Sequence, residues 1–303
     1  MITSHGRRVR LRSAFISVLA VAAISLAVVT PAAAVSPRAV AQPKVVAEPG
    51  WPTSHLPEND PLPGEAGYPA YLSARLAGFY ERSARVRTLG GQEGSVTVIG
   101  AVSPPAGDFS EPVTLHTKRF VRCFWALDPD RARARFYPAI HPLTSYSEDA
   151  NRVAPWWHAH GNSEWAKHRE RLLILLEQQA KLERMARIVG KDALPAAQQV
   201  TLTCADLVNE GLLRQSSFSA VDRYCSPLRQ AAMLRVIVHF VDRAERAVAE
   251  GIEPGPIASL PVLATLSRLG EEYGEDRVGE IERLWNEIDD GFHALEEARD
   301  AVR

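Results

Sequence analysis

Few residues in this 303-residue chain have the types and spacing that catalysis or metal binding requires. Residues 156–160 (WWHAH), with His168 nearby, suggest metal ligation because histidine is a common ligand. No Asp, Glu or Cys at a fixed spacing completes a tetrahedral set, so the sequence favours no metal site. Ser145 lies outside any G-x-S-x-G pattern and has no evident histidine and acid partners. The residues alone predict no catalytic centre.

A phosphate-binding loop would be the clearest sign of nucleotide chemistry. Its pattern, G-x-x-x-x-G-K-[ST], supplies backbone amides and a lysine to the phosphates and a hydroxyl to magnesium. The one Gly-Lys pair in the sequence is Gly190-Lys191, and Asp192 follows it. Because the pair follows a helical pattern and not a buried strand, we interpret Gly190 as a helix stop.

A basic helix is a second candidate for phosphate binding. Arg131, Arg133 and Arg135 alternate along a short predicted helix. This spacing spreads the three side chains around the helix, so we expect a solvated surface.

Composition limits the class of protein. Hydrophobic residues make up 46% of the chain, and 35 basic against 36 acidic residues give a net charge of −1. No overall field would attract nucleic acid or an anionic membrane. Cys123, Cys204 and Cys225 are odd in number and form no CxxC pair, which indicates buried or inert thiols and neither a disulfide framework nor a zinc site.

The first 63 residues differ from the rest. Residues 1–35 have the layout of a secretory signal, with a basic start, an apolar run (FISVLAVAAISLAVV) and small residues at 31–34. Residues 36–63 are rich in proline and predict a disordered linker. Two interpretations remain open: a genuine export signal, or sequence not native to the domain behind it.

Residues 64–150 alternate between helix and strand patterns. Apolar spacing predicts a helix over 68–86, and the β-branched run 95–102 predicts a strand buried on both faces. Ser110 is expected to cap a helix that has Pro112 in its first turn. A second short strand over 123–127 and a helix starting at Asp128-Pro129 continue the alternation of strands and helices that is typical of a parallel α/β sheet. Two strands do not complete such a domain, so this part lacks its neighbours or borrows them from a partner.

Residues 151–303 predict a helical bundle. Apolar stripes at helical spacing favour core packing over a cofactor site. The expected helices cover 165–189, 202–213, 226–248, 257–269 and 276–302.

Longer motifs show a family resemblance. They are residues 67–72 (GYPAYL), 90–114 (GGQEGSVTVIGAVSPPAGDFSEPVT), 124–128 (FWALD), 137–140 (YPAI), 143–147 (LTSYS) and 221–227 (VDRYCSP). Together they resemble the catalytic A subunit of V-type and archaeal-type rotary proton-translocating ATPases, from about residue 64 to 300. The resemblance implies the end of a RecA-like parallel-sheet nucleotide-binding domain over 64–150, and the C-terminal helical domain over 151–303.

The resemblance also implies roles for individual residues. Tyr137 would lie against adenine and Phe218 would form the opposite wall, with Leu212 and Gln215 on the same side. The alternative is that Tyr137 and Phe218 are ordinary aromatics of a domain interface. The loop Asp108, Phe109, Ser110 and Glu111 would lie at an interface between subunits, so its acids are not expected to form an acid/base pair.

The departures from the family decide the expected chemistry. The intact family binds ATP or ADP with Mg, and here the phosphate loop, the general-base glutamate and the magnesium-positioning carboxylate are absent. We therefore expect no catalytic residue, no tightly bound cofactor and no ATPase activity in the chain alone. We favour a C-terminal portion of the catalytic A-type polypeptide whose front was lost or misread.

The expected partners and location follow the same resemblance. The partners would be the central rotor subunits and the B subunit, with no nucleic acid and only indirect membrane contact. The location would be cytoplasmic and peripheral to the membrane. If the signal-like segment is genuine, the alternative is a non-catalytic, exported helical protein. The direction of the machine, pump or synthase, stays open.

Overall fold

The computed structural model of the chain describes residues 67–302. The signal-like segment and the linker, residues 1–63, lie outside this range. The described residues fall into two compact units, 67–124 and 125–302, and each is described by itself. Between residues 67 and 302, no helix combines the length and apolar character that a membrane span requires.

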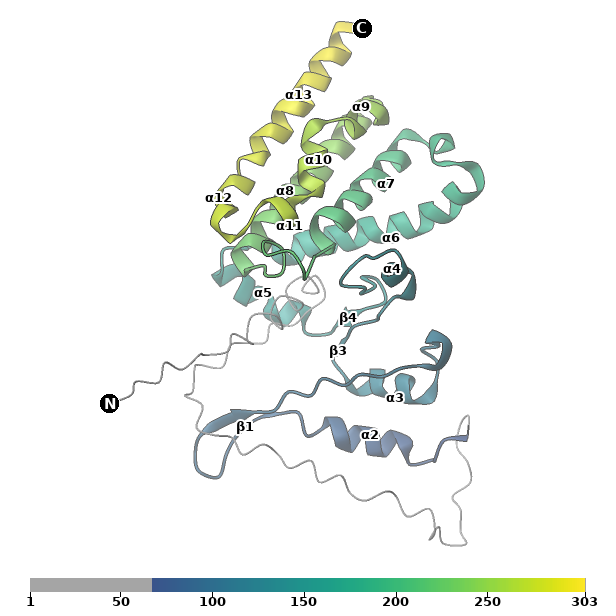
Figure 1. Cartoon of the computed structure of the whole chain (residues 1–303), viewed down its shortest axis with the longest axis vertical. Helices are drawn as coiled ribbons and strands as arrows, with labels where there is room; N and C mark the ends of the chain where they lie inside the picture. Colours follow the sequence, from purple (N-terminus) through teal and green to yellow (C-terminus); the bar gives the residue numbers. More distant parts are fainter. Residues whose placement is uncertain (1–66, 303) are drawn as a thin grey trace, which may run out of the picture. The chain divides into compact units, whose positions relative to one another are not determined.

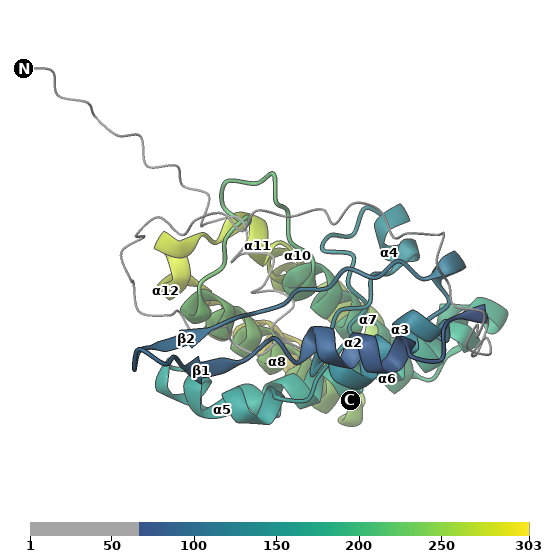
Figure 2. The same ribbon diagram turned by 90° about the horizontal axis from the view of Figure 1, so that it is seen from below.

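The 67–124 unit contains two helices and a short hairpin. Helix α2 (Leu72–Tyr80) lies beside α3 (Pro112–Phe120), as Figures 1 and 2 show. Strands β1 (Arg85–Arg87) and β2 (Glu93–Ser95) pair antiparallel, with Val86 opposite Gly94. A 3₁₀ turn η3 (Pro105–Gly107) precedes α3, and β3 (Cys123–Phe124) follows it.

Three expectations for this unit are wrong in detail. The helix over 68–86 ends at Tyr80, and residues 85–87 are a strand. The buried strand over 95–102 is not formed, and Val96 and Ile99 are 59% and 72% exposed. A strand buried on both faces requires neighbouring strands, and within 67–124 none runs beside 96–102. The cap of α3 is Glu111, not Ser110.

The 125–302 unit is mostly helical, and the described part of the chain confirms the expected bundle. Helix α8 (Pro227–Ala249) packs against α6 (Trp165–Val189), α7 (Ala196–Val208) and α13 (Leu284–Val302) (Figure 1). The other elements are α4 (Pro129–Arg133), β4 (Tyr146–Ser147), α5 (Ala150–Ala159), η4 (Lys191–Ala193), the π-helical turn η5 (Asn209–Leu213), α9 (Pro254–Ala258), α10 (Pro261–Ser267), α11 (Leu269–Glu272), η6 (Glu275–Arg277) and α12 (Val278–Ile281).

Local sequence explains where these helices begin and end. Pro129, Pro227, Pro254 and Pro261 each stand in the first turn of a helix, where the missing N–H is not needed. Gly190, with φ of 87°, ends α6 as expected. The expected helix over 257–269 is divided into α9, α10 and α11, and Pro261 begins α10. The expected helix over 276–302 is likewise divided into η6, α12 and α13.

Candidate functional site

The segment that carries Tyr137 is built from a capped turn. The Asp128 carboxylate accepts a hydrogen bond from the Asp130 N–H at 2.8 Å and so caps α4. After α4, Arg135 adopts a left-handed backbone with φ of 57°. Tyr137 follows with 53% of its surface exposed, so its ring is open to solvent.

The segment that carries the other three candidate residues leaves the end of α7. Helix α7 continues directly into η5, in which Leu212 is buried. Gln215 is buried as well, and its side-chain N–H donates to the Asp222 carbonyl at 2.7 Å. Phe218 is 99% exposed. Leu212 and Gln215 therefore point into the protein, whereas Phe218 points away from it.

The two segments meet at one backbone hydrogen bond. The Gln215 N–H donates to the Tyr137 carbonyl at 2.7 Å. Leu212 and Gln215 line one small cavity, which Phe218 does not line. Within the 125–302 unit, the structure thus brings Tyr137 and Gln215 together, and Leu212 shares the cavity with Gln215. The remaining residues that line the cavity are Arg214, Asp222, Cys225, Gln230 and Met233.

A buried arginine, which the sequence analysis missed, holds this loop. Arg229 is fully buried, and its guanidinium donates to the carbonyls of Tyr224 and Gly270, both at 2.7 Å. The Asp222 carboxylate lies 4.0 Å away and accepts the Ser216 N–H. Burial raises the pKa of Asp222, although the Ser216 N–H and Arg229 act in the opposite direction. Charged groups this deep require such partners.

The sequence held a signal for Arg229. Its spacing of four and eight residues from Met233 and Ile237 places it on the buried stripe of α8. A charged residue on an apolar stripe predicts buried hydrogen-bond partners.

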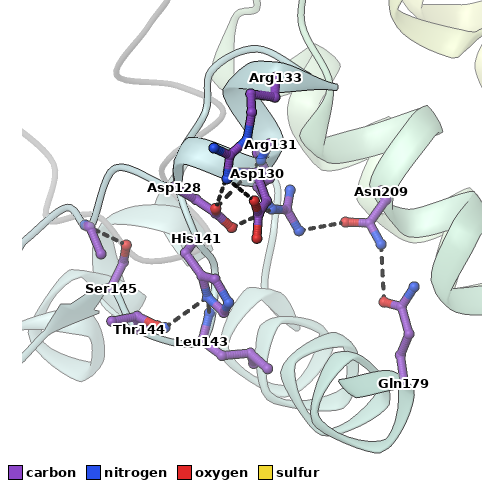
Figure 3. A network of polar contacts seen from close by, with 11 residues as sticks. Asp128, Asp130, Arg131, Arg133, His141, Leu143, Thr144, Ser145, Gln179 and Asn209 are labelled. Carbon is purple, nitrogen blue, oxygen red and sulfur yellow. Dashed lines mark hydrogen bonds and ion pairs between the residues drawn. The ribbon is translucent and has the colours of Figure 1, made fainter. Parts of the chain in front are cut away.

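Arg131 also departs from expectation. We expected a solvated side chain, but only 19% of it is exposed. Its Nη2 donates to the Asn209 Oδ1 at 2.9 Å, as Figure 3 shows. The partner residue is 78 positions away, so a local helical pattern could not reveal the contact. Arg133 is 74% exposed and pairs with Asp130 at the surface, as expected.

The expected interface loop lies in the 67–124 unit, where Glu111 caps α3 and Asp108 accepts hydrogen bonds within the loop. Asp108 accepts the Ser110 N–H at 2.9 Å, and Glu111 accepts the Thr114 N–H at 2.9 Å. Burial alone would raise the pKa of Glu111. Hydrogen bonds from Thr114, Tyr68 and the Val113 N–H outweigh burial and lower that pKa to about 2. The Phe109 ring meets Phe124 edge-on, with 5.7 Å between centroids.

The histidines considered as metal ligands, and Ser145, make contacts that support the fold. His160 stacks on Trp156 with 3.8 Å between ring centroids. His168 is buried, and burial lowers its pKa. Across residues 67–302, no three His, Cys, Asp or Glu side chains are grouped to hold a metal ion. Ser145 accepts the Ala126 N–H at 3.0 Å, which is a structural contact.

The cysteines and the Gly-Lys pair behave as expected. Cys204 and Cys225 are buried free thiols, and burial raises the pKa of Cys225 to about 12. Cys123 is partly buried and is not part of a disulfide. The Lys191 ammonium lies 3.7 Å from the Asp206 carboxylate, in line with the interpretation of a helix end.

Comparisons with known proteins define the class. The nucleotide-binding domain of the ATP synthase alpha/beta family matches residues 58–147, and the C-terminal domain of V and A type ATP synthase matches residues 154–255. Over these residues, the chain belongs to the A-subunit family of V- and A-type ATP synthases.

Individual relatives support this assignment. The A subunit of the A-type ATP synthase from Pyrococcus abyssi is 46% identical over 236 residues, which is 77% of this chain and 23% of that protein. The V-type ATP synthase alpha chain of Nitrosococcus oceani is 44% identical over 234 residues, 77% of this chain and 40% of that protein. The chain thus spans well under half the length of these relatives.

A solved structure is similar as well. The ATP synthase subunit NeqB of Nanoarcheaum equitans has a TM-score of 0.50 and 26% identity. The similarity covers 59% of this chain and 42% of that one.

Proposed function

We propose that residues 125–302 of this A-subunit portion provide one side of an adenine-binding wall, with Tyr137 and Phe218 as the ring contacts. The observation that carries the proposal is the 2.7 Å hydrogen bond from the Gln215 N–H to the Tyr137 carbonyl. It joins the two segments that the family resemblance assigns to the base. Leu212 and Gln215 support the wall from inside, while the two rings are exposed to a ligand.

These residues fit a base but not a magnesium triphosphate. An exposed aromatic face suits stacking, which contributes roughly 1–3 kcal/mol per base. The 303 residues contain no phosphate-binding loop, and residues 67–302 offer no grouped metal ligands. Because a dissociation constant of about 1 mM requires about 4.1 kcal/mol, we expect ATP and ADP to bind this chain more weakly than millimolar.

A weak-binding measurement tests the proposal. Adenosine added to the purified chain should show broadened base-proton NMR signals, and Tyr137→Ala or Phe218→Ala should reduce the broadening severalfold. Tyr71→Ala is the matched control, because Tyr71 is also about half exposed, at 47%, and lies in the other unit. Equal broadening in the wild type, Tyr137→Ala and Tyr71→Ala would refute the wall.

The same proposal covers partners and place. The B subunit would contact the loop at Asp108–Glu111, and the central rotor subunits would contact the end of α6. Met185, Ile188 and Val189 at that end are 45%, 85% and 56% exposed, which favours a protein contact there. Such an assembly works peripheral to a membrane, on its cytoplasmic side.

The rotor contact can be tested directly. Ile188→Asp should weaken binding to purified rotor subunits, whereas Ile174→Asp, a 45% exposed residue in the first half of α6, should not. Unchanged binding by Ile188→Asp would remove the end of α6 from the contact.

A further inference from the structure

A series of side-chain hydrogen bonds runs from Arg131 in α4 through Asn209 in η5 to Gln179 in α6. Arg131 donates to the Asn209 Oδ1 at 2.9 Å, and the Asn209 Nδ2 donates to the Gln179 Oε1 at 3.1 Å. The Gln179 Nε2 then donates to the carboxylates of Glu183 at 3.0 Å and Asp206 at 3.2 Å. Figure 3 shows Asn209 between Arg131 and Gln179.

The hydrogen bonds of this series have a fixed donor-to-acceptor direction. A guanidinium only donates hydrogen bonds, and an ionised carboxylate only accepts them. With Arg131 at one end and carboxylates at the other, each amide must accept on the Arg131 side and donate on the other side. Gln179 is 9% exposed, so a lost partner would leave a buried polar group unsatisfied.

The hydrogen-bond chain supplies a second attachment between the two wall segments. Arg131 precedes Tyr137 by six residues, and Asn209 precedes Gln215 by six. The Arg131–Asn209 bond and the Tyr137–Gln215 bond therefore join the same two segments at two places. A single bond leaves the segments free to pivot about it, whereas a second bond fixes their spacing at another point and restricts that pivoting.

The Arg131 side chain is itself held in place. Its guanidinium lies over the Phe136 ring, 4.5 Å from the centroid, and its Nε is 4.0 Å from the Asp128 carboxylate. Phe136 is the residue directly before Tyr137. Movement of Arg131 would therefore be transmitted to the backbone that carries the candidate ring.

We infer that Arg131 and Asn209 are positioning residues, which set the spacing between the Tyr137 segment and the η5–Gln215 segment through this hydrogen-bond chain. The inference rests on the proposed function for the meaning of that spacing. The spacing itself can be measured without any ligand.

The first measurement is amide hydrogen exchange in the full chain. Arg131→Met should speed exchange of the Gln215 N–H about tenfold, while amides in the middle of α8 keep the wild-type rate. Arg133→Met is the matched control from the same helix, because Arg133 pairs only at the surface. Arg131→Lys, which can still donate to Asn209, should recover most of the protection.

Asn209→Ala provides an independent variant if Arg131→Met does not fold, and it should expose the same amide. The inference is overturned if the Gln215 amide exchanges at the Arg133→Met rate in both Arg131→Met and Asn209→Ala. A uniform increase at Gln215 and in α8 would also overturn it, because that pattern indicates only global destabilisation.

The adenosine experiment separates this inference from the proposed function. If wild-type chain broadens adenosine signals, Arg131→Met should reduce the broadening severalfold and Arg131→Lys should restore it. Unchanged broadening in Arg131→Met would overturn the inference and leave the adenine wall standing. No broadening by the wild type, together with the expected exchange pattern, would refute the wall and leave the attachment standing.

Discussion

Arg229 and Arg131 are both arginines whose side chains are largely buried, and each connects segments that lie apart in the sequence. Arg229 holds the carbonyls that close the loop carrying Phe218, and Arg131 reaches Asn209. The family resemblance supplied the aromatic candidates, and the spacing of apolar residues in α8 indicates that Arg229 lies on its buried face. The sequence could not predict the Arg131 contact, since the type of a residue does not reveal a partner 78 positions away.

Removing the Arg229 guanidinium should be costly. Arg229→Met leaves Asp222 buried beside unpaired carbonyls, and breaking such a buried pair costs about 3–5 kcal/mol. Urea unfolding should show this loss in the free energy of unfolding. Arg223→Met, at an exposed position in the same loop, should stay within about 0.5 kcal/mol of the wild type. A small effect of Arg229→Met would show that the loop does not depend on the cation.

The Glu111 cap should make stability depend on pH. Its pKa in the folded chain is about 2, against 4.5 ordinarily, so the folded state favours the carboxylate. The stabilisation is present above about pH 4.5 and is lost as pH falls towards 2. Because the group is only partly buried and water screens its charge, its contribution is at most about 1 kcal/mol.

Exchange protection of the Thr114 amide measures the Glu111 cap. Glu111→Gln should lower the protection at pH 6, and the difference from the wild type should shrink as pH approaches 2. Glu81→Gln, an exposed acid at the end of α2, is the control. A constant difference between pH 6 and 2 would mean that the charge is not what caps α3.

At the scale of elements, helices were predictable where a cap or proline marks an end. Ser226-Pro227 and Asp128-Pro129 start helices as the sequence predicts, and Gly190 ends one. The failed strand over 95–102 has a different cause. A helix makes its own hydrogen bonds, whereas a strand requires neighbours, and apolar sequence alone does not supply them.

The contact of η5 with α10 depends on a glycine. A Cβ at Gly211 would lie 2.4 Å from the Leu266 carbonyl oxygen, which belongs to a helix backbone and cannot turn aside. We expect Gly211→Ala to destabilise the chain by about 1–3 kcal/mol, measured as a lower urea midpoint. Gly279→Ala in α12, where nothing lies within 4 Å, should be neutral or stabilising. Equal midpoints for the two variants would show that η5 and α10 can separate at little cost.

At the scale of the whole molecule, the family was predictable because long motifs survive in order along the chain. The absence of ATPase activity, which we expect from what those motifs do not include, stays a prediction. The one Gly-Lys pair of the 303-residue sequence is followed by Asp192 and lies at a helix end, so it does not match the phosphate-loop pattern.

The purified chain should therefore not turn over Mg-ATP above the buffer rate, because phosphoryl transfer depends on groups that hold the phosphates. Phosphate release over hours, calibrated with a known ATPase, measures this. Lys191→Ala should behave like the wild type. Turnover that Tyr137→Ala abolishes would contradict the expectation, since it would connect hydrolysis to the candidate base wall.

The hydrogen bonds that link Arg131, Asn209 and Gln179 also limit which substitutions are tolerated at these positions during evolution. A mutation that replaces Arg131 with an apolar residue leaves the Asn209 Oδ1 without its donor, and replacing Asn209 deprives both Arg131 and Gln179 of a partner. A protein with a single substitution at either position should therefore be less stable than one with both residues kept or both replaced. Related natural sequences should therefore keep both Arg131 and Asn209 or replace both. Sequencing close relatives would show whether the two positions covary.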